Sequence, residues 1–300
     1  MGPQLLRLFH VPSELLPRLV ASSGLVEETD AKHLGFSLSI AGLAGDQQAA
    51  LFGQGCVSPG LAKNTYGTGA FLLVFTGDRV PVAAGGLLAT AACGAAGEPA
   101  YASEGSVFIA GAAVQWLRDG LGLIAHAAET EVLAATIPDT GGVYFVPAFV
   151  GLGTPHWEPN ARGTITGLTR GTSRAHLVRA SLEAMAHSSA DLLEAMASSE
   201  GLVVPALRVD GGAAANDWLM QFQADLLGIP VERPDLVETT AVGAGGLAGL
   251  ALGVWGTADQ FVRQRRFRRF EPVMDQGTRD RHRSGWRRAV EAALAWARAR

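Results

Sequence analysis

Short apolar runs that end at glycine are the feature that most constrains the fold. Residues 64–76 read as a strand, a Tyr66-Gly67-Thr68-Gly69 turn and a second strand. Residues 207–209 (Leu-Arg-Val) read as another short strand, which leads directly into Asp210-Gly211-Gly212. Helical patterns separate such runs along the chain, and this alternation is typical of an α/β fold in which helices cover a sheet.

Capping residues set the limits of the expected helices. Ser173 precedes a long helix that Gly201 ends, and a second helix at 216–227 is stopped by Gly228. Residues 239–256 are uncharged but rich in alanine and glycine, which favours a packed core helix over a membrane span. Further helices are predicted at 11–20 and 106–123, and further strands at 35–41, 87–93, 101–104 and 143–149.

Composition indicates a globular protein, since 48% of the 300 residues are hydrophobic and 17% are charged. The net charge of −4 argues against a nucleic-acid partner. Residues 263–300 hold 12 arginines and four acids, yet the spacing of Trp286, Val290 and Leu294 favours a helix packed on the protein. Cys56 and Cys93 are expected to be buried and reduced, and with no signal peptide recognised, we expect a cytoplasmic protein without membrane contact.

Two glycine-rich turns could receive phosphate. At Tyr66-Gly67-Thr68-Gly69, glycines allow backbone N–H groups to approach an oxyanion, and Thr68 adds a hydroxyl donor. At residues 209–213 a strand meets a helix, so helix-terminal donors could face a nucleotide. Either turn alone is more often a tight turn or a piece of architecture.

Asp46 is the strongest candidate for a catalytic group. It follows a strand and a glycine and leads an alanine-rich helix, which places it at the carboxyl edge of a sheet, where α/β folds bind ligands. A carboxylate there could act as a general base in phosphoryl transfer. The alternative is an ordinary helix N-cap, and the polar neighbours Gln47 and Gln48 favour the functional reading slightly.

Taken together, these segments resemble the FGGY family of carbohydrate kinases and, within it, the glycerol kinases. The matching segments keep the family's order and extend over most of the chain. They are 45–54, 63–69, 111–119, 147–153, 161–163, 167–171 and 208–213, with 163–183 similar to the family's C-terminal signature.

The resemblance implies an actin-like ATPase (ribonuclease H-like) fold with ATP and substrate bound between two domains. By that similarity Asp46 would be the base, and Gln47 and Phe71 would join it in lining the glycerol pocket. Magnesium would bridge the ATP phosphates, without an assigned protein ligand. The residues expected to contact ATP are Thr68, Gly69, Gly111, Gln115, Gly212 and Asn216.

The resemblance also divides the chain. Residues 53–300 match the family's C-terminal kinase domain, and residues 1–52 look like the last helix and strand of its N-terminal domain. The strand at 35–41 is therefore expected to lack its sheet partners. We expect a glycerol kinase that is incompetent without the missing domain, which a separate chain could supply, and which could form homo-oligomers. The alternatives are a non-catalytic nucleotide-binding remnant and a kinase for another polyol or a pentulose.

Overall fold

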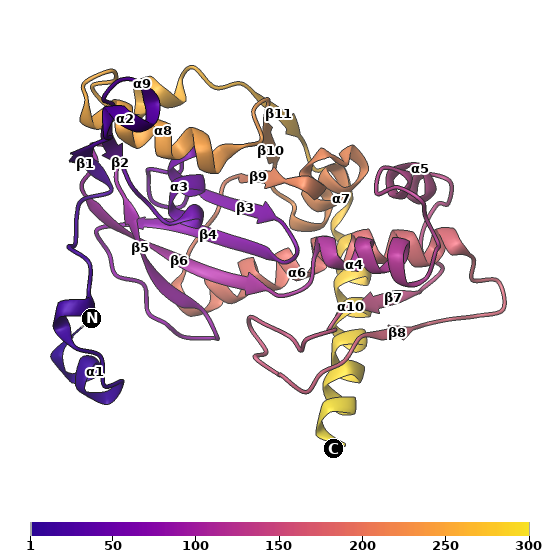
Figure 1. Ribbon diagram of the computed structural model, residues 1–300. Coiled ribbons are helices and arrows are strands. Elements are labelled where there is room, and N and C mark those ends of the chain that lie inside the picture. The colour runs from indigo at the N-terminus through magenta and orange to yellow at the C-terminus, as the bar shows by residue number, and fades with distance from the viewer. Residues whose placement is uncertain (1, 300) are drawn as a thin grey trace.

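A mixed sheet lies at the centre of the protein (Figure 1). The structure is a computed structural model that describes residues 2–299. Within that range the sheet has seven strands in the order β11-β10-β9-β3-β4-β6-β5, with β3, β9 and β10 parallel to one another. The strands are β3 (Ala62–Tyr66), β4 (Ala70–Gly77), β5 (Leu88–Cys93), β6 (Pro99–Val107), β9 (Leu207–Gly211), β10 (Val231–Pro234) and β11 (Phe267–Phe270). The α/β class predicted from the sequence is confirmed.

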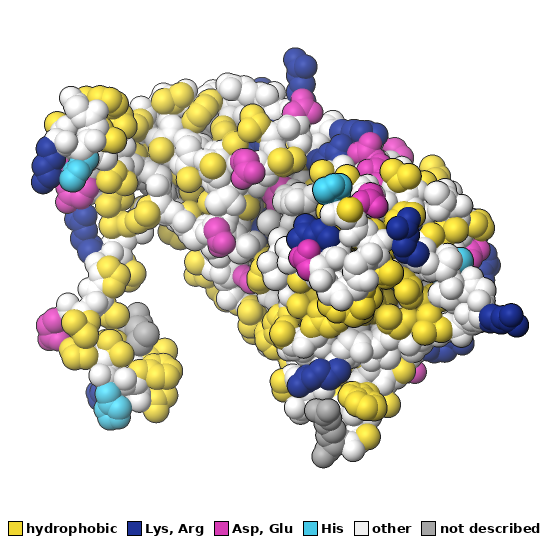
Figure 2. Space-filling model, turned by 45° about the vertical axis from the view of Figure 1, so that its right-hand side comes forward, with side chains coloured by type: hydrophobic (Ala, Val, Ile, Leu, Met, Phe, Trp, Pro, Cys, Tyr) yellow, Lys and Arg dark blue, Asp and Glu magenta, His cyan; other side chains and the backbone are white. Residues whose placement is uncertain are grey.

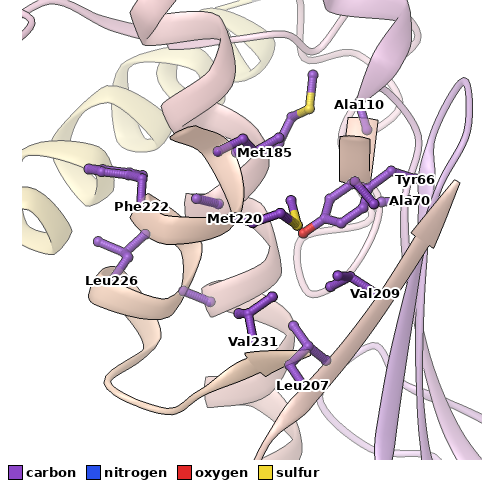
Figure 3. Close-up of a cluster of buried hydrophobic side chains, with 14 of the residues drawn as sticks. Tyr66, Ala70, Ala110, Met185, Leu207, Val209, Met220, Phe222, Leu226 and Val231 are labelled. Carbon is purple, nitrogen blue, oxygen red and sulfur yellow. The ribbon is translucent and has the colours of Figure 1, made fainter. Parts of the chain in front are cut away.

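Helices cover both faces of this sheet. On one face lie α3 (Asp46–Gly53), α8 (Thr239–Ala251) and α9 (Ala258–Val262), joined by Phe52 of α3 stacking on Phe261 of α9. On the other face lie α6 (Arg174–Glu200) and α7 (Asp217–Leu227). Figure 3 shows the core between them, where Val209 and Tyr66 of the sheet face Met185 and Met220 of the two helices.

The helix limits follow the capping residues closely. Ser173 forms a capping box with His176 at the start of α6, and Gly201 ends that helix with a φ of 65°. The Asn216 side chain accepts a hydrogen bond from the Leu219 amide at 2.9 Å, and Gly228 ends α7 with a φ of 68°. These four limits are confirmed because each depends on the local chemistry of one residue.

The arginine-rich C-terminal segment forms α10 (Gln276–Arg298), which packs against α6 and α7 and buries Trp286 and Val290. This confirms the packed helix predicted there. Cys56 and Cys93 are buried and unpaired, also as predicted. Among residues 2–299, no helix combines the length and hydrophobicity that a membrane span requires.

The N-terminal part differs from the prediction. The expected helix at 11–20 is absent. Instead, α1 spans Pro3–Leu8 and a single 3-10 turn spans Ser13–Leu15, because Pro12 and Pro17 on either side of this turn prevent a longer helix. The strand expected without partners is β2 (Ser39–Gly42), and it pairs antiparallel with an unpredicted strand, β1 (Ser23–Glu28). A short helix, α2 (Ala31–Leu34), connects them. Figure 1 shows α1 standing apart from the sheet.

Two other predicted elements are shorter than expected. Residues 106 and 107 belong to β6, and the helix predicted at 106–123 is only α4 (Gly111–Gln115), which continues as one π-helical turn, Trp116–Gly120. The run at 143–149 contributes β7 (Tyr144–Val146), which pairs with β8 (Thr164–Thr166) in a small separate sheet. One further helix, α5 (Glu129–Ala135), lies between α4 and β7 in the chain.

Candidate functional site

The turn between β3 and β4 is held against the start of α4 by backbone hydrogen bonds. The Gly67 carbonyl accepts from the Gly111 amide at 3.0 Å, and the Thr68 carbonyl accepts from the amides of Ala110 and Ala112 at 2.8 and 3.1 Å. A β-carbon at Gly111 would lie 2.5 Å from the Gly67 carbonyl oxygen, so this approach requires glycine. The amides of Thr68 and Gly69 donate to no backbone carbonyl among the described residues, and the Thr68 amide, at an exposed position, remains available to an anion.

Beside this turn lies a cavity of about 530 Å³. Its walls come from the ends of β3 and β9, from α4 and from the start of α5. The lining residues are Tyr66, Gly67, Thr68, Gly111, Val114, Gln115, Arg118, Ala127, Ala128, Thr130, Glu131, Leu182, Gly212, Ala213, Ala215 and Asn216. The structure thus brings together five of the six residues assigned to ATP from the sequence. The sixth, Gly69, is buried behind the turn, where a β-carbon would overlap the Val107 carbonyl oxygen.

The cavity walls combine apolar and polar groups in a way that suits a nucleoside. Val114 and Leu182 offer apolar surface for a heterocyclic base, while Arg118 and Thr130 are polar. The Asn216 side chain is already engaged, because its Nδ2 donates to Thr130 Oγ1 at 3.2 Å and its Oδ1 caps α7. Asn216 therefore holds α7 against α5 at the cavity wall.

Asp46 lies outside this cavity, on the opposite face of the sheet. It is exposed and is the first residue of α3, whereas Gly45 occupies the N-cap position. Its Oδ1 accepts a hydrogen bond of 2.7 Å from the Gln47 amide. The prediction that Asp46 is the N-cap is therefore wrong by one residue. Its carboxylate still lies in the first turn of α3, where the helix dipole favours a negative charge.

A buried lysine lies beneath Asp46. Lys63 of β3 donates from Nζ to Gln47 Oε1 and, at 2.9 Å, to Thr65 Oγ1, and its side chain is fully buried. Burial lowers the pKa of Lys63 to about 8, and the nearby carboxylates of Asp210 and Glu104 only partly oppose this effect. Burial likewise raises the pKa of Glu104, against the influence of Lys63. Lys63 thus ties the sheet to the Asp46 helix and places a titratable cation near the carboxylate.

Asp210 connects the strand β9 to the helices on the same face. Its Oδ2 accepts from Gln54 Nε2 at 2.9 Å and from the Thr239 hydroxyl, which links the end of α3 to the start of α8. Its Oδ1 is buried without a hydrogen-bond partner among the described residues. The Asp-Gly-Gly turn predicted from the sequence therefore does two things: Asp210 joins elements, and Gly212 lines the cavity.

Phe71 packs against an apolar cluster on the Asp46 face that includes Leu51 and Leu73, and it lines no described cavity. The structure therefore places Asp46, Gln47 and Phe71 on one side of the sheet without enclosing them as a pocket. Sequence reasoning gave no role to Lys63 or Glu104. One signal was available, since Lys63 is one of only two lysines in the chain and falls within a strand.

Three comparisons with known proteins agree with this architecture. Residues 62–252 match the FGGY family of carbohydrate kinases, C-terminal domain. The glycerol kinase of Carboxydothermus hydrogenoformans is 56% identical over 295 residues, which cover 98% of this chain and 59% of the relative. The crystal structure of Plasmodium falciparum glycerol kinase with ADP has a TM-score of 0.89 and 35% identity, covering 98% of this chain and 59% of that one.

A xyloylose kinase from Brucella ovis is also similar, with a TM-score of 0.84 and 25% identity over all of this chain and 62% of that structure. The family match extends over more than half of the sequence. The chain therefore belongs to the FGGY family of carbohydrate kinases. It spans about 59% of the length of the glycerol kinases that it matches.

Proposed function

We propose that the chain is the nucleotide-binding part of a glycerol kinase, which transfers the γ-phosphate of ATP to glycerol and yields glycerol 3-phosphate and ADP. The observation that carries this proposal is the cavity at the Gly67–Gly69 turn, which gathers Thr68, Gly111, Gln115, Gly212 and Asn216. The similarity to proteins named glycerol kinase supports the choice of substrate.

In this proposal the adenosine end of ATP lies between Gly212 and Asn216, and the phosphates approach the free amide of Thr68. A glycerol hydroxyl attacks the γ-phosphorus, its proton passes to a carboxylate oxygen of Asp46, and ADP leaves with the electrons of the broken P–O bond. Gln47 and Phe71 would contact glycerol. Lys63 holds Gln47 in place through its hydrogen bond to Oε1.

Magnesium would neutralise the charge on the phosphates, and the described residues fit that requirement. Mg²⁺ in such sites is held by phosphate oxygens and by one or two carboxylates. This chain offers the exposed carboxylate of Asp46 and the unpartnered Oδ1 of Asp210. Both are hard oxygen ligands; Asp46 follows β2, and Asp210 lies in β9, which leads into the second glycine turn.

A second domain would complete the site, because accurate positioning of two substrates requires walls on both sides of a cleft. The surface around residues 5–43 supports this proposal, since many of its apolar side chains are exposed. They include Leu5, Leu8, Phe9, Leu25, Leu34, Phe36 and Leu38. Figure 2 shows hydrophobic side chains on the segment that carries α1, at the lower left. We further propose that the completed enzyme acts in the cytoplasm and assembles as a homo-oligomer.

Two alternatives remain as competing outcomes of one experiment. A nucleotide-binding remnant would bind ATP without phosphoryl transfer, and a kinase of different specificity would accept a pentulose, as the similarity to the Brucella ovis protein allows. ADP release is measured by a coupled assay with Mg-ATP and glycerol or xylulose. The chain is assayed alone and then with an added glycerol-kinase N-terminal domain.

We expect glycerol-dependent ADP release only after that addition. Asp46→Asn should then lower turnover by orders of magnitude, while Asp78→Asn, in an exposed turn after β4 and outside the cavity, should leave it unchanged. Full activity of Asp46→Asn would remove Asp46 from the mechanism. ATP binding by calorimetry without any turnover would favour the remnant.

A further inference from the structure

Helices α6 and α10 bring three potential metal ligands together outside the proposed nucleotide site. Glu183 and His187 lie four residues apart on α6, and His282 lies on α10. One ligand atom from each of the three residues falls within 4.8 Å of the other two. Four-residue spacing puts two side chains on the same face of a helix, so the pair on α6 presents its ligands in one direction.

Two of these ligands are buried and lack partners. Glu183 is 2% exposed and His187 is 0% exposed. Glu183 Oε2 and His187 Nε2 make no hydrogen bond among the described residues, and His282 Nδ1 lies 3.8 Å from Glu183 Oε2. A buried polar atom left unsatisfied costs about 1–3 kcal/mol, so this pair requires an occupant that supplies the missing interactions.

The chemistry of the three groups selects the type of occupant. A neutral imidazole offers one ring nitrogen with a lone pair, which makes histidine the commonest metal ligand in proteins. Two neutral imidazoles and one carboxylate favour zinc-type transition metals over Mg²⁺, which prefers oxygen ligands. Three protein ligands with an open fourth position also match the tetrahedral coordination of Zn²⁺.

We propose that Glu183, His187 and His282 bind a zinc-type divalent cation, with water as the fourth ligand, and that the ion fastens α10 to α6. The ligand atoms, which lie up to 4.8 Å apart, must move closer by as much as about 1.4 Å, because the edge of a tetrahedral site with bonds near 2.1 Å is roughly 3.4 Å. His282 is the ligand with room to do so, since 17% of its side chain is exposed whereas the α6 pair is enclosed.

Two arginines surround the site and set limits on its affinity. Arg179 donates to Glu183 Oε1 at 2.8 Å, which fixes the carboxylate and leaves Oε2 for the metal. Arg283 Nη1 lies 3.3 Å from His187 Nδ1. A ring that binds the metal through Nε2 carries its proton on Nδ1, so two N–H donors would face each other there, and this contact opposes metal binding. However, that guanidinium also donates to the His187 carbonyl at 3.1 Å and is paired with Asp191 and Glu194. Arg283 can therefore give up the ring contact without losing its partners.

The test uses the full chain without a histidine tag, after EDTA treatment and dialysis, titrated with zinc chloride by calorimetry and followed by thermal melting. We expect one equivalent to bind with a Kd in the micromolar range or below and to raise Tm, whereas magnesium chloride gives neither effect. His282→Gln should weaken binding at least tenfold and abolish the rise in Tm. His33→Gln, at an exposed position on the short helix α2, should bind zinc as the wild type does.

Cobalt(II) provides the second readout, because its absorption distinguishes ligand sets. Visible bands of a tetrahedral nitrogen–oxygen site would support the proposal, and thiolate charge-transfer bands would overturn it by pointing to Cys56 or Cys93. Absence of stoichiometric zinc binding by the wild type, or unchanged binding by His282→Gln, would also overturn it. None of these measurements depends on kinase activity.

Discussion

Gly243 of α8 lies against Ala49 of α3 so closely that a β-carbon at Gly243 would overlap the Ala49 carbonyl oxygen. The contact is reciprocal, since a β-carbon at Gly53 of α3 would overlap the carbonyl oxygen of Thr239 in α8. The two helices therefore meet backbone to backbone. This close approach positions α3, and with it Asp46, over the buried Lys63.

Gly243→Ala should consequently lower the free energy of unfolding by about 1–3 kcal/mol, because the new methyl group forces the two helices apart. Gly245→Ala is the matched control: it lies on the same helix, is exposed and has nothing within 4 Å of an added β-carbon. That change should stabilise by up to about 1 kcal/mol through helix propensity. Equal effects of both changes in urea unfolding would argue against the close contact.

Gly212→Val should weaken ATP binding about tenfold or more and leave Tm unchanged. An added β-carbon at Gly212 meets nothing within 4 Å, so the fold accepts it, but the side chain would occupy the cavity that Gly212 lines. Isothermal calorimetry with ATP checks the affinity. Gly171→Val, in an exposed loop outside the cavity, serves as the control, and equal affinities of the two variants would count against nucleotide binding here.

Tyr66→Phe should destabilise the protein by about 1–3 kcal/mol, because it leaves a buried acceptor unsatisfied. The Tyr66 hydroxyl donates to Gln223 Oε1 at 2.6 Å in a fully buried position between β3 and α7. Within residues 2–299 the Tyr101 hydroxyl makes no such bond, so Tyr101→Phe should change stability by a few tenths of a kcal/mol at most. Chemical denaturation measures the free energy of unfolding of both variants. A Tyr66→Phe variant as stable as the wild type would contradict the prediction.

The buried Lys63 predicts how stability depends on pH. Its pKa is about 8 in the folded protein and its ordinary value is 10.5, so between these limits the unfolded chain binds more protons. The contribution of Lys63 to the free energy of unfolding therefore rises with pH from about 8 to 10.5. Below pH 8 the folded protein must bury the charged ammonium group, and the full cost of that burial applies. The unfolding free energy of the wild type relative to Lys63→Met should rise across that window, by at most on the order of 3 kcal/mol.

Urea unfolding at several pH values measures this difference. Burial also raises the pKa of Cys56, to about 12, which lowers stability as the pH rises above 9, but that thiol is present in both proteins and largely cancels. A flat or falling difference between the wild type and Lys63→Met would mean that Lys63 is not buried as a charged group.

Local chemistry explains which parts of the fold were predictable. The caps at Ser173 and Asn216 and the stops at Gly201 and Gly228 were correct, because each depends on one residue and its immediate neighbours. By contrast, residues 106 and 107 were predicted as helix, but they extend β6 because β4 supplies backbone partners at Phe71 and Ala70. A pattern within one segment cannot indicate such a partner. The strand β1 was missed for the same reason, because it forms by pairing with β2.

In the candidate site, too, the features set by local chemistry were predictable and those set by long-range contacts were not. Both glycine turns were found from sequence, because glycine there answers a local need for close backbone approach. The burial of Lys63 could not be found in this way, since it depends on β9, a strand far along the chain that pairs with β3 at Lys63. Thr130 and Glu131 line the cavity because α5 packs against α6 and α7 and is bonded to Asn216, which are again long-range contacts.

One long-range contact also has a consequence for how the protein is made. The Ser23 hydroxyl donates to the Leu247 carbonyl at 2.9 Å across 224 residues, and β1 and β2 both pack on α8. On the ribosome, residues 23–52 therefore emerge long before the helix that covers them has been synthesised. Throughout that interval the side chains that pack on α8 lack that native partner, which makes this segment the natural place for a chaperone to bind the nascent chain.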